Sequence, residues 1–126
     1  MMQTLTLVAL GGAIGASLRF LAGAGLLRLI GATGFPVAIL SVNILGSFLM
    51  GLFVVAAAHK GLNAWIPFVT TGVLGGFTTF SAFSLETMTL IERGALGQAM
   101  LYVTLSVGLS VLGLALGLWC ARGLWA

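Results

Sequence analysis

The sequence predicts an all-α integral membrane protein whose four transmembrane helices form a single domain over residues 1–126. Composition supplies the first reason, because 60% of the residues are hydrophobic and only 6% are charged. The mean hydropathy of +1.23 lies far above that of soluble globular domains. The second reason is the spacing of turn-forming residues. It divides the chain into four apolar stretches of roughly the 20 residues that a helix needs to cross a bilayer, and no soluble domain is left over.

The first apolar stretch extends from about residue 4 to residue 30. It ends at the segment GATGFP, residues 31–36, where glycine and proline interrupt a helix. It lacks the basic start of a signal peptide and contains Arg19, so we expect a retained helix. The second stretch covers residues 37–58 and is followed by the most polar segment of the chain, a loop over residues 59–63.

The third stretch opens with Trp65 and Pro67, which are typical of a membrane interface, and extends to about residue 91. The sequence Glu-Arg-Gly at residues 92–94 predicts a turn, and the fourth stretch covers residues 96–120. Interfacial residues mark the end of this last stretch: Trp119, Arg122 and Trp125.

The distribution of charged residues does not determine one orientation of the chain in the membrane. Short cytoplasmic loops normally carry the excess of Lys and Arg. With four crossings, Lys60 and Arg122 lie on one side and Arg28 and Arg93 on the other, which is an equal count. A chain inserted both ways can pair with its inverted copy about a two-fold axis in the membrane plane. We therefore predict a dual-topology, antiparallel homodimer; the alternative is one orientation selected by a weak bias, for example from Arg19.

Several functional classes are disfavoured by the sparse polar residues. Five basic and two acidic residues are too few for a nucleic-acid patch, so no nucleic-acid partner is expected. A single cysteine, Cys120, forms no disulfide framework and is expected to act as a small hydrophobic residue. His59 has no acidic or cysteine neighbours with which to form a metal site or a nucleophile–base pair. We therefore do not expect an enzyme.

Strongly polar side chains inside a membrane segment are costly and mark function by default. Arg19 shares a helix face with Gly11, Gly15 and Gly23 at four-residue intervals, which favours close approach of a neighbouring helix. The arginine either reaches an interface or an internal ion pair, or attracts anions. Asn43 either bonds neighbouring helices together or offers its N–H groups to an anion.

The third stretch contains the segment GGFTTFSAFSLE, residues 75–86. Its adjacent glycines and threonines form helices poorly, which predicts a third helix broken at its centre with backbone carbonyls free to bind a cation. Phe80, Phe83 and Glu86 follow at three-residue intervals. Spacing alone favours packing for this aromatic stripe, although ring edges carry partial positive charge and can accompany an anion.

The fourth stretch carries three hydroxyl groups on one helix face, from Tyr102, Ser106 and Ser110. Packing of small residues accounts for the two serines nearly as well as a polar path does. It accounts less easily for the tyrosine at the head of the same line.

Residues 75–86 resemble the GGxTTFSTFSxE signature of the Fluc (CrcB) family of microbial fluoride channels. Three further features occur in the family's order and spacing. They are the GG-x-x-GA-x-x-R pattern of residues 11–19, the pair Val42-Asn43 followed by Gly46, and the hydroxyl ladder of the fourth stretch. The resemblance therefore covers essentially the whole chain.

This resemblance implies an antiparallel, dual-topology homodimer in the inner (plasma) membrane of a bacterium. Such a dimer passively conducts fluoride out of the cytoplasm through two pores and so confers fluoride resistance. The resemblance also implies a structural sodium ion at the dimer centre. The expected partners are fluoride, a second copy of the chain and the lipid bilayer.

The resemblance further implies roles for individual residues. The backbone carbonyls of Gly75 and Thr78 would hold the sodium ion, and Asn43 would orient Phe83 and donate to fluoride. Phe80 and Phe83 would form an edge-on aromatic box. The remaining positions implied are Thr79, Tyr102, Ser106, Ser110 and Glu86 in a polar track and Arg19 towards a vestibule. One position departs from the family pattern, because Ala82 stands where the family usually has threonine.

Two other hypotheses are weighed against the channel. A proton-coupled exporter with four helices and dual topology has a similar size, but such proteins are expected to carry the working carboxylate in the first helix. This chain has Arg19 there, and its intramembrane acid, Glu86, is in the third stretch. A membrane assembly without transport activity would leave the predicted helix break and the hydroxyl ladder unexplained.

Overall fold

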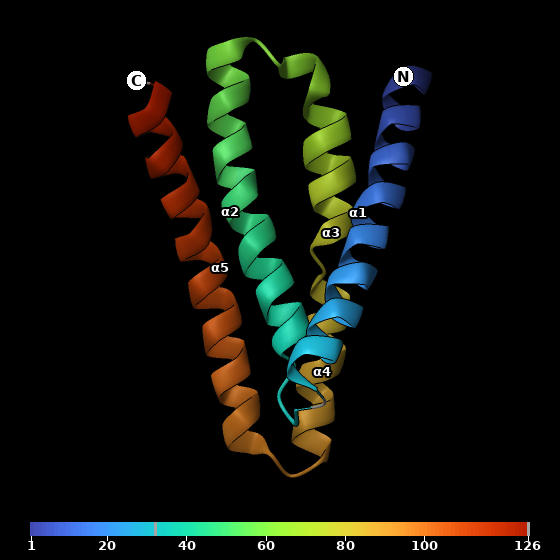
Figure 1. The fold of residues 1–126 in the computed structure, drawn as a ribbon, viewed down its shortest axis with the longest axis vertical. Helices are drawn as coiled ribbons and strands as arrows, with labels where there is room; N and C mark the ends of the chain where they lie inside the picture. The colour runs from blue at the N-terminus through green and yellow to red at the C-terminus, as the bar shows by residue number, and fades with distance from the viewer. Residues whose placement is uncertain (32, 126) are drawn as a thin grey trace.

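The computed structural model describes residues 1–31 and 33–125, which form helices joined by short turns (Figure 1). Within these residues, four helical segments are long and apolar enough to cross a membrane. They are Met2–Ile30, Val37–Lys60, Asn63–Glu92 and Leu96–Trp125. The predicted all-α fold with four membrane-spanning segments is thus confirmed.

The first two crossings are each a single long helix that ends at a glycine. Helix α1 (Met2–Ile30) ends at Gly31, whose φ is 82°. Helix α2 (Val37–Lys60) ends at Gly61, which has φ 67° and ψ 34°. Glycine adopts such left-handed conformations without steric cost and so ends both helices.

Two predicted helix ends are wrong. His59 and Lys60 lie in the last turn of α2 rather than in a loop, because the helix continues to the glycine stop and basic side chains are favoured at a helix C-terminus. Helix α5 (Leu96–Trp125) continues beyond residue 120. Lys60 Nζ lies 5.5 Å from the centre of the Trp125 ring, and this cation–π contact holds the end of α5 beside α2.

The third crossing consists of four short elements. They are η1 (Asn63–Trp65), a 3₁₀ helix; η2 (Pro67–Leu74), a π-helix; α3 (Gly75–Phe77); and α4 (Phe80–Glu92). Thr78 and Thr79 connect α3 to α4 in extended conformation. Thr78 has φ −85° and ψ 159°, and Thr79 has φ −152° and ψ 126°. The Thr79 hydroxyl oxygen accepts a hydrogen bond from the Ala82 amide at 3.1 Å and so caps the start of α4.

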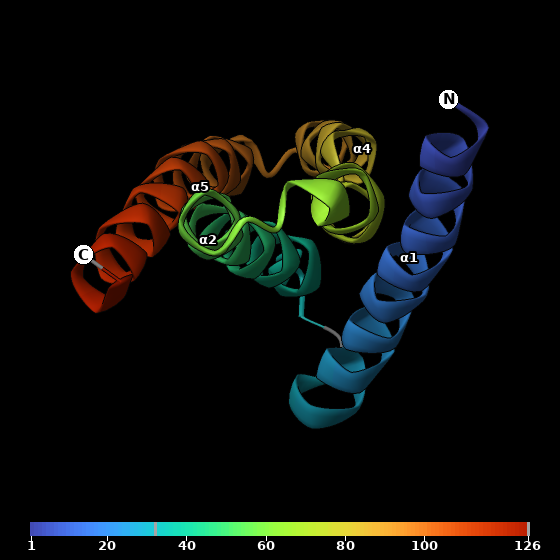
Figure 2. The same cartoon turned by 90° about the horizontal axis from the view of Figure 1, so that it is seen from above.

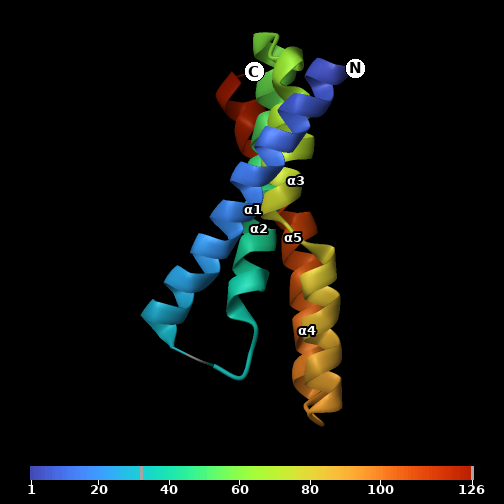
Figure 3. The same cartoon turned by 90° about the vertical axis from the view of Figure 1, so that its right-hand side faces the viewer.

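The two halves of this crossing pack against different helices. Helix α1 lies along η2 and α3 and diverges from α4 (Figure 3). Helix α5 packs along α2 and also contacts α4 (Figures 1 and 2). The extended residues Thr78 and Thr79 therefore mark the level at which the crossing changes its partner.

Buried side chains are few, and one cluster lies where α4 meets α5. It comprises Phe83, Leu90, Ala99 and Tyr102. By contrast, many large apolar side chains face outwards, including Phe20, Leu29 and Trp119. Outward apolar faces are what a bilayer requires of a membrane-spanning segment.

Candidate functional site

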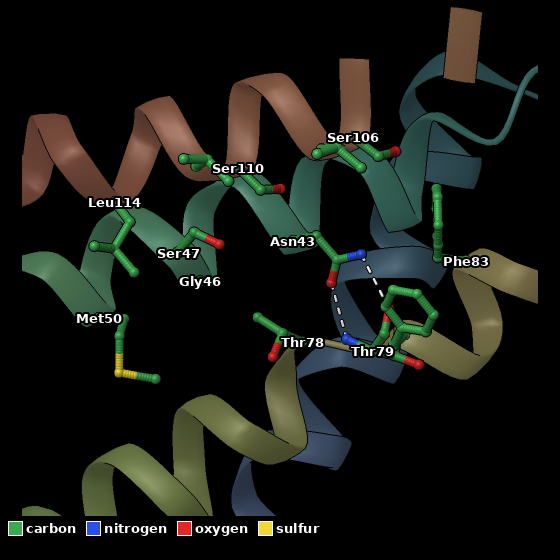
Figure 4. A pocket seen from close by; sticks show the side chains of 13 residues that line it. Asn43, Gly46, Ser47, Met50, Thr78, Thr79, Phe83, Ser106, Ser110 and Leu114 are labelled. Atoms are coloured by element: carbon green, nitrogen blue, oxygen red, sulfur yellow. Dashed lines mark hydrogen bonds between the residues drawn. The ribbon is translucent and has the colours of Figure 1, made fainter. Parts of the chain in front are cut away.

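A cavity of about 380 Å³ lies between α2, α5 and the junction of α3 with α4 (Figure 4). Seven residues for which the sequence predicted a role line it: Asn43, Thr78, Thr79, Phe80, Phe83, Ser106 and Ser110. The other lining residues are Gly46, Ser47, Met50, Val107, Val111 and Leu114. No charged side chain is among those that line the cavity in the described part of the chain.

Asn43 is bonded to the backbone of Thr79 by both ends of its amide (Figure 4). Its Nδ2 donates to the Thr79 carbonyl oxygen at 3.0 Å, and its Oδ1 accepts from the Thr79 amide at 2.8 Å. The side chain thus exchanges the pair of bonds that two residues of adjacent β-strands exchange. One Nδ2 hydrogen remains after these bonds are made. Asn43 therefore fixes the extended connection and still has a donor to offer.

These bonds also affect the two carbonyl groups that the resemblance assigned to sodium. In a continuous helix the amide of Thr79 would donate to the carbonyl of Gly75, and the amide of Ala82 to the carbonyl of Thr78. Here the Thr79 amide donates to Asn43, and the Ala82 amide donates to the Thr79 hydroxyl. The Gly75 and Thr78 carbonyls are therefore deprived of their helical donors.

Phe80 and Phe83 have different surroundings although they lie one turn apart. The two ring centres are 5.4 Å apart with an angle of 60° between the ring planes, so the rings meet edge to face. The Phe80 side chain is 77% exposed in the single chain, whereas Phe83 is 8% exposed and packs against Tyr102. Both rings line the cavity, but Phe80 leaves most of its surface uncovered, whereas Phe83 is buried.

Glu86 and Tyr102 lie beyond the cavity, next to Phe83. The Tyr102 hydroxyl donates to Glu86 Oε2 at 3.0 Å, and the tyrosine is fully buried, with 0% exposure. The Phe83 and Tyr102 ring centres are 5.2 Å apart. The carboxylate and the phenol thus form a polar pair beside Phe83, and the tyrosine lies one turn of α5 from Ser106.

The hydroxyl groups of Ser106 and Ser110 are buried and have no hydrogen-bond partner among residues 1–31 and 33–125. Both serines belong to α5 and line the same cavity as Asn43 (Figure 4). A buried hydroxyl without a partner is costly, and such groups are normally satisfied by protein or by a bound molecule. The cavity therefore holds unused donors beside Asn43.

Arg19, Gly75 and Ala82 are not among the residues that line the cavity. Arg19 is half-buried on α1, the helix that packs on η2 and α3. Gly75 is exposed in the single chain. Ala82 contributes its backbone amide to the cap of α4.

Several lining residues on α2 have no role predicted from the sequence. Gly46, Ser47 and Met50 follow Asn43 at helical spacing, and this periodicity could have identified them. Gly46 has a specific role, since a β-carbon there would overlap the Thr78 methyl group and lie 3.2 Å from Phe77 Cδ2. Its lack of a side chain lets the connection between α3 and α4 approach α2.

A cation bound at the break between α3 and α4 would need backbone oxygens as ligands. Among the described residues, no group of three or more His, Cys, Asp or Glu side chains is arranged to hold a metal ion. Carbonyl oxygens are ligands that suit hard cations. The carbonyls of Gly75 and Thr78 match this requirement.

Comparison with known proteins identifies similar chains. The family model described as "CrcB-like protein, Camphor Resistance (CrcB)" matches residues 6–118. The chain is 70% identical to a protein of Roseobacter denitrificans named fluoride-specific ion channel FluC, over 98% of this chain and 99% of that one. Proteins with the same name from Ruegeria sp. and Cereibacter sphaeroides are 69% and 58% identical, each over 98% of both chains.

Proposed function

The chain belongs to the CrcB-like family, and on that premise we propose that it is a fluoride-specific channel that passively exports fluoride from the cytoplasm. The names of its relatives support this function. The single observation that carries it in this chain is the pair of buried serine hydroxyls that line the cavity together with Asn43 and have no partner in the described part of the chain. The family is one of channels rather than enzymes.

The cavity is suited to a small anion that loses its water. Dehydration of fluoride must be offset by donors in a narrow space. Ser106, Ser110 and the remaining Nδ2 hydrogen of Asn43 supply such donors. The edges of the Phe80 and Phe83 rings add weaker positive potential. No cation lines the cavity in the described residues, so the ion is attracted without being held too firmly to leave.

Glu86 and Tyr102 continue this path beyond Phe83. The Tyr102 hydroxyl, which donates to Glu86, becomes a donor to fluoride whenever that bond opens. Thr79 lies at the other side of the path, where its hydroxyl already caps α4. Arg19 is assigned to the vestibule, where its charge raises the local concentration of anions without binding them inside the pore.

We further propose that two copies assemble as an antiparallel, dual-topology homodimer with two pores. Equal numbers of Lys and Arg on the two sides support insertion in both orientations. Phe80 lines a cavity with polar groups and is nevertheless 77% exposed, which is consistent with a second copy covering this side of the cavity. The inner membrane of a bacterium is the proposed location, and fluoride resistance is the proposed benefit to the cell.

A structural sodium ion at the centre of the dimer belongs to the same proposal. The carbonyls of Gly75 and Thr78 would hold it, because their helical donors are directed to Asn43 and to the Thr79 hydroxyl. The ion would neutralise the carbonyl dipoles at the break and join the two copies. In this proposal the sodium ion stays in its site while fluoride passes through the pores.

The test is fluoride efflux from liposomes that contain the purified protein, followed with a fluoride electrode. We expect rapid fluoride release, little chloride release and no requirement for a proton gradient. Strict coupling of efflux to pH would favour the exporter alternative, and the absence of efflux would overturn the channel. For the sodium site, replacement of Na⁺ by N-methylglucamine should lower both the efflux and the thermal stability of the protein. Equal values in the two cations would remove the site.

A further inference from the structure

The aromatic side chains next to the cavity form a longer series than the sequence suggested. Beyond Phe80, Phe83 and Tyr102, the series ends at Phe35, which lies in the turn between α1 and α2. The ring centres of Phe35 and Tyr102 are 5.6 Å apart and their planes are at 88°. Phe35 therefore meets Tyr102 edge to face, on a side of the tyrosine not occupied by Phe83.

Phe35 belongs to the packing around the Tyr102–Glu86 pair. It is partly buried and packs on the cluster of Phe83, Leu90, Ala99 and Tyr102. Tyr102 has 0% exposure, so its ring direction is set by the side chains packed on it. That direction determines whether the hydroxyl points at Glu86 Oε2.

Two hydrogen bonds close to Phe35, both accepted by its carbonyl oxygen, help to shape the turn that carries it. The Phe35 carbonyl oxygen accepts from the Thr33 hydroxyl at 2.7 Å and from the Val37 amide at 2.9 Å. Both bonds are local, and they shape the turn without positioning it against the rest of the molecule.

Arg93 supplies the bond that positions the turn. Its Nη2 donates to the Gly34 carbonyl oxygen at 2.9 Å, one residue before Phe35. Arg93 follows directly after α4, the helix that carries Phe83 and Glu86. The bond therefore attaches the turn to the same helix that provides the partner of Tyr102.

We propose that Phe35 is a positioning residue for the Tyr102–Glu86 pair and that Arg93 holds Phe35 in place through the Gly34 carbonyl. This inference rests on the proposed function, because its effect is on fluoride conduction. Loss of the Phe35 ring or of the Arg93 bond frees the Tyr102 ring to turn, so the hydroxyl no longer stays aligned on the path. Neither residue needs to touch the ion.

The experiment uses Phe35→Leu, which keeps an apolar side chain, and Arg93→Gln. The matched control is Arg28→Gln, which removes the same charge from the same end of the molecule but lies in the last turn of α1. Because Tyr102 is the single tyrosine, 3-fluorotyrosine labels that position alone for ¹⁹F NMR. Each variant is measured for fluoride efflux from liposomes and for the ¹⁹F resonance of the intact protein in detergent.

Phe35→Leu should lower fluoride efflux by about tenfold, on the scale of a lost aromatic contact, and Arg93→Gln, which removes an exposed bond, by about two- to fivefold. They should also shift or broaden the ¹⁹F resonance, whereas Arg28→Gln should change neither quantity. Wild-type efflux in Phe35→Leu, or lower efflux with an unchanged resonance, would overturn the inference. If the unmodified protein itself conducts no fluoride, the proposed function fails, while the resonance shifts still show whether Phe35 and Arg93 position Tyr102.

Discussion

The third crossing is packed in two different ways on the two sides of Thr78. Before it, η2 and α3 contact α1 through glycines and backbone atoms; a β-carbon at Gly76, for instance, would lie 2.7 Å from the Gly12 carbonyl oxygen. After it, α4 contacts α5 through aromatic rings and the Glu86–Tyr102 hydrogen bond. The backbone contacts of the first half leave no room for added side-chain atoms. The second half packs through side chains, and it borders a cavity and contains polar groups. The first half is therefore suited to a structural role, and we propose that the second half carries the conduction path.

The largest effect is expected from a side chain added to the glycine-packed half. A β-carbon at Gly15 would overlap the Val73 carbonyl oxygen and lie 2.8 Å from the Phe77 amide nitrogen, and these backbone atoms cannot move aside. We expect Gly15→Val to lower the stability by about 3 kcal/mol or more, as for severe overpacking. Thermal unfolding of the purified protein measures this loss. Gly12→Ala is the control, since no atom lies within 4 Å of a β-carbon there, and equal stability of the two variants would contradict the comparison.

The next effect is expected at the boundary between the two halves. Asn43→Asp keeps the acceptor for the Thr79 amide but replaces the donor to the Thr79 carbonyl with a second oxygen. A buried group left without its partner costs about 1–3 kcal/mol. We expect about a tenfold to hundredfold lower fluoride efflux, because the connection between α3 and α4 loses its fixed geometry.

The matched control for this change is Asn63→Asp in η1, which introduces the same charge at an exposed position. Efflux of Asn63→Asp should equal that of the unmodified protein. If both substitutions reduce efflux equally, the added charge is responsible and the bonds of Asn43 are not.

The sequence predicts some features of the two halves better than others. Composition and turn residues are sufficient for the four crossings, because hydrophobic length is a local property. Helical spacing also places Asn43 with Gly46, and Ser106 with Ser110, on shared faces. The sequence does not distinguish Gly15, which packs on backbone atoms, from Gly23, where a β-carbon would have no atom of the described residues within 4 Å. That difference depends on where α1 diverges from the third crossing.

The contact between Phe35 and Tyr102 is another feature that the sequence does not predict. Phe35 stands in a turn between Gly34 and Pro36, so no periodicity relates it to Tyr102, and only the folded chain brings the two rings together. The roles assigned to Asn43 and to the carbonyls of Gly75 and Thr78 came from a resemblance to a family. These roles stay predictions, and the structure adds an observation that agrees with them, because the Thr79 and Ala82 amides donate to the Asn43 and Thr79 side chains and not along a helix.

Ser106→Ala separates conduction from stability within the second half. The Ser106 side chain is 6% exposed and its hydroxyl has no partner, so its removal should leave the protein as stable or slightly more stable. Fluoride efflux should nevertheless fall by about tenfold, because a donor to the dehydrated ion is lost. Ser84→Ala is the control, since that exposed hydroxyl donates to the Phe80 carbonyl. A loss of stability without a loss of efflux would show that the serine only packs.

The smallest effect is expected where the chain departs from the family signature. Ala82 does not line the cavity, and its contribution to the second half is the backbone amide that donates to the Thr79 hydroxyl. A threonine there keeps that amide, so Ala82→Thr should change fluoride efflux by no more than about twofold, as for a substitution away from packed or polar contacts. Efflux from liposomes, compared with that of Ser106→Ala, measures this. A change as large as that of Ser106→Ala would place residue 82 on the path of the ion, and the conducting half would then extend to a face of α4 that the cavity does not reach.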